Sequence, residues 1–347
     1  MRRPRFITSC HAPPQTATLA GFVASARVSG HIVVYLPDGD RLRKHGYYIE
    51  PDVRRPGVWN LPEIGKELCE ELLVSHGDDL SEMGITATRE AMAPYMTADH
   101  IRRTFKRAYK EDKSMTEEEV LQKTELSLEQ LLKVGIGSST LSNGAYATVV
   151  SLLMNQTERP FTVVMDEYNC YFDHGHYFHV NYDEHVRRAI PPNRISVFKP
   201  FMDAMGLYPS EAGTDISKHY SEEGNGATSA GDAMMKWGAM IVGTSESRAV
   251  KSSFTRALEE AARAQSSSTL PSSGKEDGRP PPIHTVNVQR YDKNEVQHVL
   301  YNYEITGVGR LRFDRGNTAL NTEEVEYLRL VSGGIGQRLM DSCMLRI

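Results

Sequence analysis

The sequence predicts an α/β fold in which helices flank a parallel sheet and a small helical domain follows. Four short apolar runs lack the alternation of a half-exposed strand, and such runs are typical of strands buried on both faces of a parallel sheet. Segments with helical spacing of apolar residues separate these runs, and alternating strands and helices build βαβ units. The runs are His31–Leu36, Phe161–Met165, Gly238–Val242 and Ile283–Val288.

The first βαβ unit occupies the start of the chain. Arg5–Thr8 is a short strand candidate, and residues 16–28 follow as a predicted helix. One face of this helix carries apolar side chains at helical spacing, namely Leu19, Phe22, Val23 and Ala26. The run His31–Leu36, closed by Pro37-Asp38-Gly39, completes a strand–helix–strand unit within forty residues.

Two insertions interrupt the predicted core. Residues 62–155 are mainly helical in pattern and include a charged stretch at Arg102–Lys113. Residues 265–282 are rich in Ser, Gly and Pro, which is typical of a flexible surface segment. We therefore expect a core domain over residues 1–290 that contains both insertions.

The remaining residues, 291–347, are expected to form a small helical domain that resembles a lid. Two pairs of residues match the capping-box pattern, in which an N-cap side chain and an acid three residues later bond each other's backbone N–H. The pairs are Asp292 with Glu295 and Asn321 with Glu324.

Composition limits the classes of function. The 347 residues have an ordinary globular balance, with 39% hydrophobic and 24% charged residues and a formal net charge of −5. No apolar run is long enough to cross a bilayer, so no membrane is expected among the partners. A net negative charge argues against a protein whose surface is extensively covered by RNA. It remains compatible with a protein that mainly contacts other proteins or that binds RNA through a local basic patch.

Two further features concern the cellular compartment. The four cysteines are far apart in the sequence, which argues against a disulfide framework or a zinc knuckle and favours a reducing interior. The first acidic residue is Asp38, and several arginines, serines and threonines precede it. This composition is typical of a mitochondrial transit peptide, although basic N-termini are common in other proteins.

The segment Ser9–Thr16 lies between the first predicted strand and helix, where a phosphate-binding P-loop of the form GxxxxGK[ST] would lie. It has the length of that motif and keeps the final Thr16. Ser9 and Pro14 replace the two glycines, and Gln15 replaces the lysine. A P-loop works by directing backbone N–H groups at phosphate oxygens, and prolines have no N–H to donate. An ordinary loop is the alternative interpretation.

Two other strand ends carry polar residues that suit a nucleotide site. Asp166 and Glu167 directly follow the run Phe161–Met165, as in a Walker B motif that places a carboxylate near Mg²⁺. Thr244 follows the run Gly238–Val242, where a residue that senses the γ-phosphate would lie. Both patterns also arise by chance, the first in apolar strands and the second at routine strand exits.

A stretch rich in histidine, Asp173–His179 with His185 beyond it, raises the question of a metal site. Its imidazoles converge on zinc only if the loop curls back, so we expect a solvated, aromatic-rich loop and no metal. Such a loop also suits contact with RNA bases or with a protein surface. No arrangement of nucleophile, base and acid stands out, and we assign no catalytic residue.

In their order along the chain, these segments resemble the death-associated protein 3 family, which is also the mitochondrial ribosomal small-subunit protein 29. The resemblance covers most of the chain. The segments that carry it are Thr16–Gly21, Ile32–Asp38, Trp59–Pro62, Phe161–Glu167, Gly238–Val242, Val286–Tyr303, Glu323–Leu328 and Arg338–Cys343.

The resemblance implies a P-loop NTPase (AAA-like) fold and residence in the mitochondrial matrix. It also implies a place in the head of the small ribosomal subunit near the large subunit, with other mitochondrial ribosomal proteins and small-subunit rRNA as partners. The family binds guanine nucleotide with Mg²⁺. In this chain, Gln15, Thr16, Asp166, Glu167 and Thr244 are the candidate remnants of that site.

The function expected from these observations is a structural component of the mitochondrial small ribosomal subunit without enzymatic activity. Two alternatives are an active AAA-type NTPase and a switch that responds to nucleotide. Both need bound nucleotide, and an active loop requires Lys at position 15 and Gly at position 14, where this chain has Gln15 and Pro14.

Overall fold

The structure is a computed structural model of the chain. The residues that it describes are 5–10, 14–44, 46, 48–109, 117–172, 177–181, 186–205, 235–245, 283–287, 291–306, 322–332, 339 and 343. The expected insertion at 265–282 lies outside these ranges, as does Asn321 of the second expected capping box.

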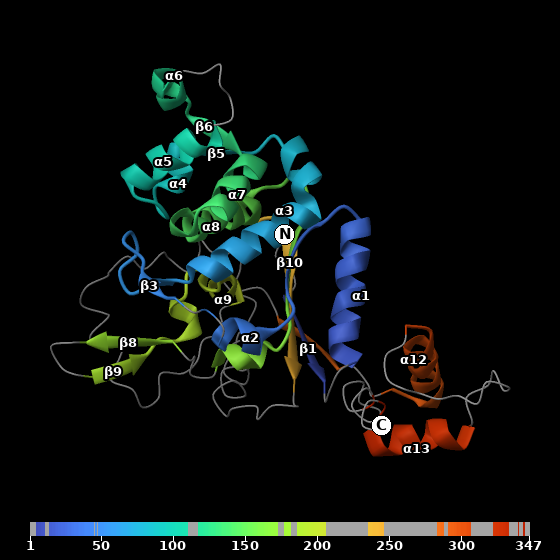
Figure 1. The fold of residues 1–347 in the computed structure, drawn as a ribbon. Coiled ribbons are helices and arrows are strands. Elements are labelled where there is room, and N and C mark those ends of the chain that lie inside the picture. Colours follow the sequence, from blue (N-terminus) through green and yellow to red (C-terminus); the bar gives the residue numbers. More distant parts are fainter. Residues whose placement is uncertain are drawn as a thin grey trace, which may run out of the picture.

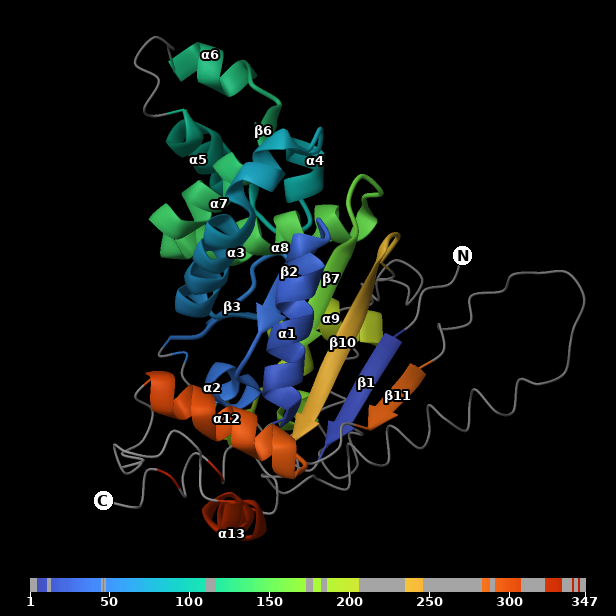
Figure 2. The ribbon, with the colours of Figure 1, turned by 90° about the vertical axis from the view of Figure 1, so that its right-hand side faces the viewer.

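A five-stranded parallel sheet forms the centre of the molecule, in the order β11-β1-β10-β7-β2 (Figure 2). All five expected strands are present, which confirms the α/β class and the parallel sheet. Their bounds are β1 Arg5–Cys10, β2 Ile32–Leu36, β7 Phe161–Met165, β10 Gly238–Ser245 and β11 Ile283–Asn287.

Helix α1 (Pro14–Val28) covers one face of this sheet (Figure 1). Its buried side chains Leu19, Val23 and Ala26 pack on Val33, Val164 and Ile241 of three strands. Phe22, expected on the same face, is 37% exposed, so that part of the prediction is wrong. The buried stripe runs through positions i, i+4 and i+7, and Phe22 lies at its margin.

The opposite face of the sheet carries the main core. Because side chains alternate along a strand, Ile32, Val34 and Leu36 of β2 point into this core, while Val33 faces α1. The longer helices that contribute to this core are α3 Pro62–Glu82, α7 Leu128–Gly137 and α8 Ser139–Asn155, and the short helix α9 Lys199–Met205 adds to it.

The segment 62–155 is mainly helical, as expected. Besides α3, α7 and α8 it contains the shorter helices α4 Arg89–Met92, α5 Ala98–Ala108 and α6 Glu117–Gln122. The segment also contains a feature that the sequence did not predict, a two-stranded antiparallel pairing of β5 (Thr86–Thr88) with β6 (Glu125–Ser127). Ser127 also caps α7 in a capping box with Gln130.

Smaller elements connect these parts. Helix α2 (Gly39–Lys44) follows β2, and the short 3-10 helices are η1 (Tyr168–Phe172) and η2 (Pro192–Arg194). Two further antiparallel pairs join β3 (Glu50–Pro51) to β4 (Trp59–Asn60) and β8 (Phe178–Asn181) to β9 (Val186–Ala189).

Helices α12 (Lys293–Thr306) and α13 (Thr322–Ser332) lie at the opposite end of the molecule from α6 (Figures 1 and 2). Their apolar side chains form a cluster of their own, which contains Val296, Leu300, Val325, Leu328, Leu339 and Cys343. The expected capping box is confirmed: the backbone N–H of Asp292 donates to Glu295 and that of Glu295 donates to Asp292, both at 2.8 Å. In the part of the chain that the structure describes, no helix is long and apolar enough to cross a membrane.

Candidate functional site

The candidate site residues lie at the carboxyl edge of the sheet, where parallel strands end and ligands bind in open α/β folds. Strand β1 ends at Cys10 and α1 begins at Pro14, so Gln15 and Thr16 belong to the first turn of α1. His11–Pro13 lie outside the described residues. Pro14 suits the first position of a helix because it lacks an N–H, and for the same reason it has none to give to a phosphate.

Asp166 directly follows β7 and is 2% exposed. Its backbone N–H donates to the carbonyl oxygen of Leu36 on β2 at 2.8 Å, which fixes the strand end. Its Oδ1 atom accepts a hydrogen bond from the backbone N–H of Glu167, also at 2.8 Å. The carboxylate is therefore held against the backbone of its own turn.

Glu167 has a φ of 51°. This value lies in the left-handed region of backbone conformation, which residues other than glycine rarely adopt. Strained backbone of this kind is found at functional sites more often than elsewhere. Its Oε2 atom accepts a hydrogen bond from the backbone N–H of Asp40 at 3.3 Å, and its carbonyl accepts one from Cys170 at 2.8 Å. These bonds join the turn after β7 to α2 and η1.

Gly39, which the sequence analysis did not single out, allows α2 to approach this turn. A Cβ at position 39 would lie 2.9 Å from the carbonyl oxygen of Glu167 and 3.0 Å from that of Asp166. Real side chains essentially never approach backbone atoms so closely. The Pro37-Asp38-Gly39 turn indicated that Gly39 lies where the chain reverses direction. Only the fold shows that Gly39 lies against the backbone of Asp166 and Glu167.

Thr244 lies near the end of β10 and is 5% exposed. Its register partner on β1 is Ser9, the first residue of the expected phosphate loop. On the other side, Val242 of β10 pairs with Met165 of β7, the residue before Asp166. The structure thus places the starting point of the loop, Thr244 and Asp166 on three neighbouring strands at one edge.

The charges near this edge are mostly paired within the chain. Arg43 and Lys44 of α2 both contact the carboxylate of Asp40, at 2.6 Å each. Burial and the negative charge of Asp166 raise the pKa of Tyr35 on β2 to about 12, so this phenol stays protonated at physiological pH. The site presents the carboxylates of Asp166 and Glu167, whereas the cationic side chains of Arg43 and Lys44 form ion pairs with Asp40.

The histidine-rich segment is described only in part, because residues 173–176 and 182–185 lie outside the described ranges. The expectation of a loop is wrong for Phe178–Asn181, which form β8 and pair with β9. The ring of His179 lies 4.9 Å from that of Trp59, so this histidine packs against an aromatic side chain. Among the described residues, no group of three or more His, Cys, Asp or Glu side chains has the geometry of a metal site.

Two comparisons with known proteins bear on the site and the fold. The family model described as mitochondrial ribosomal death-associated protein 3 matches residues 15–342. This match includes nearly all of the described core, the ends of β7 and β10 that carry Asp166 and Thr244, and helices α12 and α13. Strand β1 and residues 9–14 of the expected loop lie before it. No individual curated protein matches the chain.

Proposed function

Since the chain belongs to the mitochondrial ribosomal death-associated protein 3 family, we propose that it is a structural constituent of the small subunit of the mitochondrial ribosome. The observation that carries this proposal is the family match over residues 15–342. The protein then works in the mitochondrial matrix, where it supports translation from the head of the small subunit. Its partners are other mitochondrial ribosomal proteins, small-subunit rRNA and, through inter-subunit contacts, the large subunit.

The proposal includes a P-loop NTPase fold of the AAA type, and the order of the strands supports it. Numbered along the chain, the five strands of the sheet follow the order fifth, first, fourth, third, second. AAA-type ATPases share this order, with the phosphate loop after the first strand, the Walker B acid after the third and the sensor after the fourth. Here those positions hold Ser9–Thr16, Asp166 with Glu167, and Thr244. Residues 1–290 form the core in this proposal, and residues 291–347 the lid-like helical domain.

The residues present do not fit guanine nucleotide with Mg²⁺. The loop lacks both glycines and the lysine, and Pro14 removes a backbone donor at the start of α1. The carboxylates of Asp166 and Glu167 accept hydrogen bonds from backbone N–H groups of the protein itself. We therefore propose that the site no longer binds nucleotide and that its residues remain as structural parts of the sheet edge. The rival functions, an active NTPase and a nucleotide-dependent switch, both need this site.

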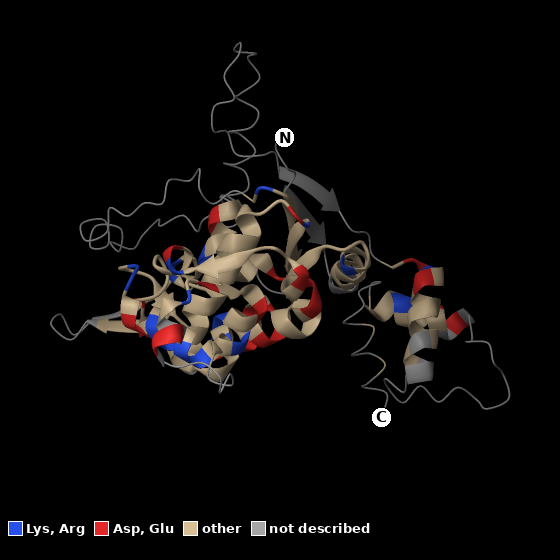
Figure 3. Ribbon diagram, turned by 90° about the horizontal axis from the view of Figure 1, so that it is seen from above, with Lys and Arg blue, Asp and Glu red and all other residues tan. Residues whose placement is uncertain are grey.

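A local basic surface supports contact with rRNA in an otherwise acidic chain. Acidic and basic segments are interspersed over the molecule (Figure 3). Contact with rRNA phosphates therefore requires a local basic patch, since no whole face is basic in this view. Helix α5 buries Ile101 and Phe105 and exposes Arg102, Arg103 and Arg107. Exposed arginines on a helix anchored by its apolar face are suited to phosphate oxygens.

Sedimentation of a tagged copy from mitochondrial lysate tests the proposed function. We expect the protein to migrate with small-subunit rRNA on a density gradient and to remain there in high salt, because structural constituents are stably integrated. Migration as a free or oligomeric species would remove the ribosomal assignment and favour the NTPase alternative.

A further inference from the structure

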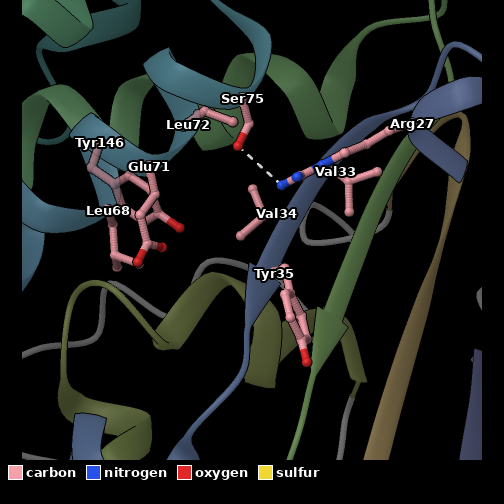
Figure 4. Close-up of a pocket in the computed structure, with 9 residues that line it drawn as sticks. All are labelled: Arg27, Val33, Val34, Tyr35, Leu68, Glu71, Leu72, Ser75 and Tyr146. Carbon is pink, nitrogen blue, oxygen red and sulfur yellow. Dashed lines mark hydrogen bonds between the residues drawn. The ribbon is translucent and has the colours of Figure 1, made fainter. Parts of the chain in front are cut away.

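A pocket opens between the end of α1, strand β2 and helix α3, away from the carboxyl edge of the sheet (Figure 4). The space inside it that the centres of water-sized molecules can occupy is about 30 Å³, and the empty volume is about 270 Å³ when the open solvent at its mouth is counted. Its aliphatic lining comes from Val33 and Val34 of β2 and Leu68 and Leu72 of α3, and the other lining residues are Arg27, Tyr35, Glu71, Ser75 and Tyr146. The aliphatic lining suits an unbranched hydrocarbon chain.

Tyr146 of α8 gives the pocket a buried polar group. The side chain is 1% exposed, and its hydroxyl group has no hydrogen-bond partner. Buried hydroxyl groups in native proteins are nearly always paired, so an unpaired one that lines a pocket indicates a missing partner. The negative charge of Glu71 contributes to the raised pKa of Tyr146, after burial and Cys69.

Glu71 stands at the same end of the pocket as Tyr146 (Figure 4). The residue is exposed, but partial loss of surrounding water raises the pKa of its carboxyl group, and the like charge of Glu67 adds to this effect. Arg41 and Arg27 act in the opposite direction, but Arg41 pairs with Glu67 and Arg27 donates to Ser75 at 3.0 Å. The carboxylate of Glu71 thus lacks a cation of its own among the described residues.

Two exposed valines are sequence neighbours of residues that line the pocket. Val28, next to Arg27, is 91% exposed, and Val74, next to Ser75, is 82% exposed. These are the two most exposed large hydrophobic side chains among the described residues. These two side chains are available for apolar contact with a protein partner.

We propose that this pocket holds the side chain of a lysine from a neighbouring protein. The four methylene groups lie along the aliphatic walls, and the ammonium group donates to the carboxylate of Glu71 and to the hydroxyl oxygen of Tyr146. Val28 and Val74 then contact apolar residues beside that lysine. Glu71 and the hydroxyl group of Tyr146 are acceptors for a cation, while Arg27, which also lines the pocket, is bonded to Ser75, so the proposed occupant is a protein that carries a lysine. Its identity as a ribosomal neighbour rests on the proposed function.

Cross-linking with a carbodiimide tests the proposal, because this reagent joins a carboxylate to an amine in direct contact without a spacer. In gradient-purified ribosomal particles, we expect a peptide containing Glu71 to be linked to a lysine of another protein. The link should disappear in Glu71→Gln and persist in Glu70→Gln, which changes the adjacent exposed carboxylate that does not line the pocket. Recovery of other carboxylate–lysine links without one at Glu71 would count against the proposal.

A second measurement uses the free full-length protein and n-butylammonium chloride as the probe. We expect the probe to shift the methyl NMR signals of Val33, Val34, Leu68 and Leu72, and sodium butyrate at equal ionic strength to leave them unchanged. Glu71→Gln should abolish the response, and no response in the wild-type protein would overturn the proposal. Binding of the probe without a link at Glu71 in the particle would also overturn it, in favour of a site for free amines. This measurement needs no ribosome, so it tests the pocket independently of the proposed ribosomal function. Failure of the ribosomal function would be detected separately, in the sedimentation experiment.

Discussion

The Nε2 atom of His76 accepts a hydrogen bond from the backbone N–H of Val33 at 3.0 Å. Val33 lies on β2, at the edge of the sheet, and no strand among the described residues pairs with the outward N–H groups of β2. His76 is 3% exposed and sits at a kink in α3, with a φ of −143°. Because Nε2 accepts, the ring is neutral and its proton is on Nδ1, 3.3 Å from Asp79.

This bond predicts that the protein loses stability in mild acid. Burial, as the largest cause, lowers the pKa of His76, and the nearby charge of Arg27 adds to it, against the opposing effect of Asp79. In the unfolded chain the pKa returns to about 6.5. Above that pH the imidazole is neutral in both states. As pH falls below about 6.5, the unfolded state binds the proton first, so the free energy of unfolding decreases.

Urea unfolding at a series of pH values between 7.5 and 5.5 measures this effect. The variant His76→Gln keeps a neutral acceptor and cannot titrate in this range, so its stability should depend less on pH than that of the wild-type protein. Equal pH dependence of the two proteins would show that other groups are responsible. In His76→Ala the N–H of Val33 is left unpaired, which should cost about 1–3 kcal/mol at neutral pH.

The close approach at Gly39 predicts a second effect on stability. Gly39→Ala introduces a Cβ that meets backbone carbonyl oxygens at 2.9 and 3.0 Å, and backbone cannot swing aside as a flexible side chain can. The free energy of unfolding should fall by about 1–3 kcal/mol. Gly21→Ala is the matched control, because a Cβ there has no atom within 4 Å and alanine favours the helix by about 1 kcal/mol. If both variants behave alike in thermal unfolding, the contact at Gly39 is not strained.

Features encoded by local pattern could be predicted from the sequence. The run Phe161–Met165 is fully buried because both faces of the sheet are covered there, and its lack of alternation expresses this. The capping box of Asp292 and Glu295 needs only residues three apart, and it is present. The strand ends that carry Asp166 and Thr244 could be placed at one edge because parallel strands all end on the same side.

Features that depend on contacts across the chain could not be predicted. The pairing of β5 with β6 joins segments of three residues, each too short to show a periodicity. The unpaired hydroxyl group of Tyr146 likewise became visible only when α8, α3 and β2 were brought together. The kink at His76 is different, because Ser75 and Gly77 flank it and kinks are common at Gly/Ser pairs, so a local signal was present.

The altered loop predicts that the purified protein binds neither GTP nor ATP with Mg²⁺ below millimolar concentrations. Without the two glycines and the lysine, the loop offers fewer backbone donors and no positive charge to the phosphates. Isothermal titration calorimetry measures the affinity, and hydrolysis should not exceed background. A micromolar affinity that Asp166→Ala abolishes would contradict the prediction.

Restoring the loop provides a positive control for the same reasoning. The triple variant with Ser9→Gly, Pro14→Gly and Gln15→Lys recreates the motif in front of α1, while Thr16 and Asp166 remain in place. We expect this variant to gain measurable affinity for nucleotide with Mg²⁺. If it does not, features beyond the loop, such as the turn at Asp166 and Glu167, also prevent binding.

The exposed arginines of α5 predict a salt-dependent affinity for RNA. Arg102 lies one residue after the buried Ile101 and is exposed, so Arg102→Glu should alter charge without disturbing the packing of the helix. Fluorescence anisotropy with a labelled RNA duplex, repeated over a range of salt concentrations, measures the affinity and its salt slope. Loss of one phosphate contact should weaken binding and reduce the slope by about 1. Lys293→Glu, an equal change of charge on α12 at the other end of the molecule, controls for the net charge. If both variants weaken binding equally, the attraction comes from overall charge and α5 is not the contact surface.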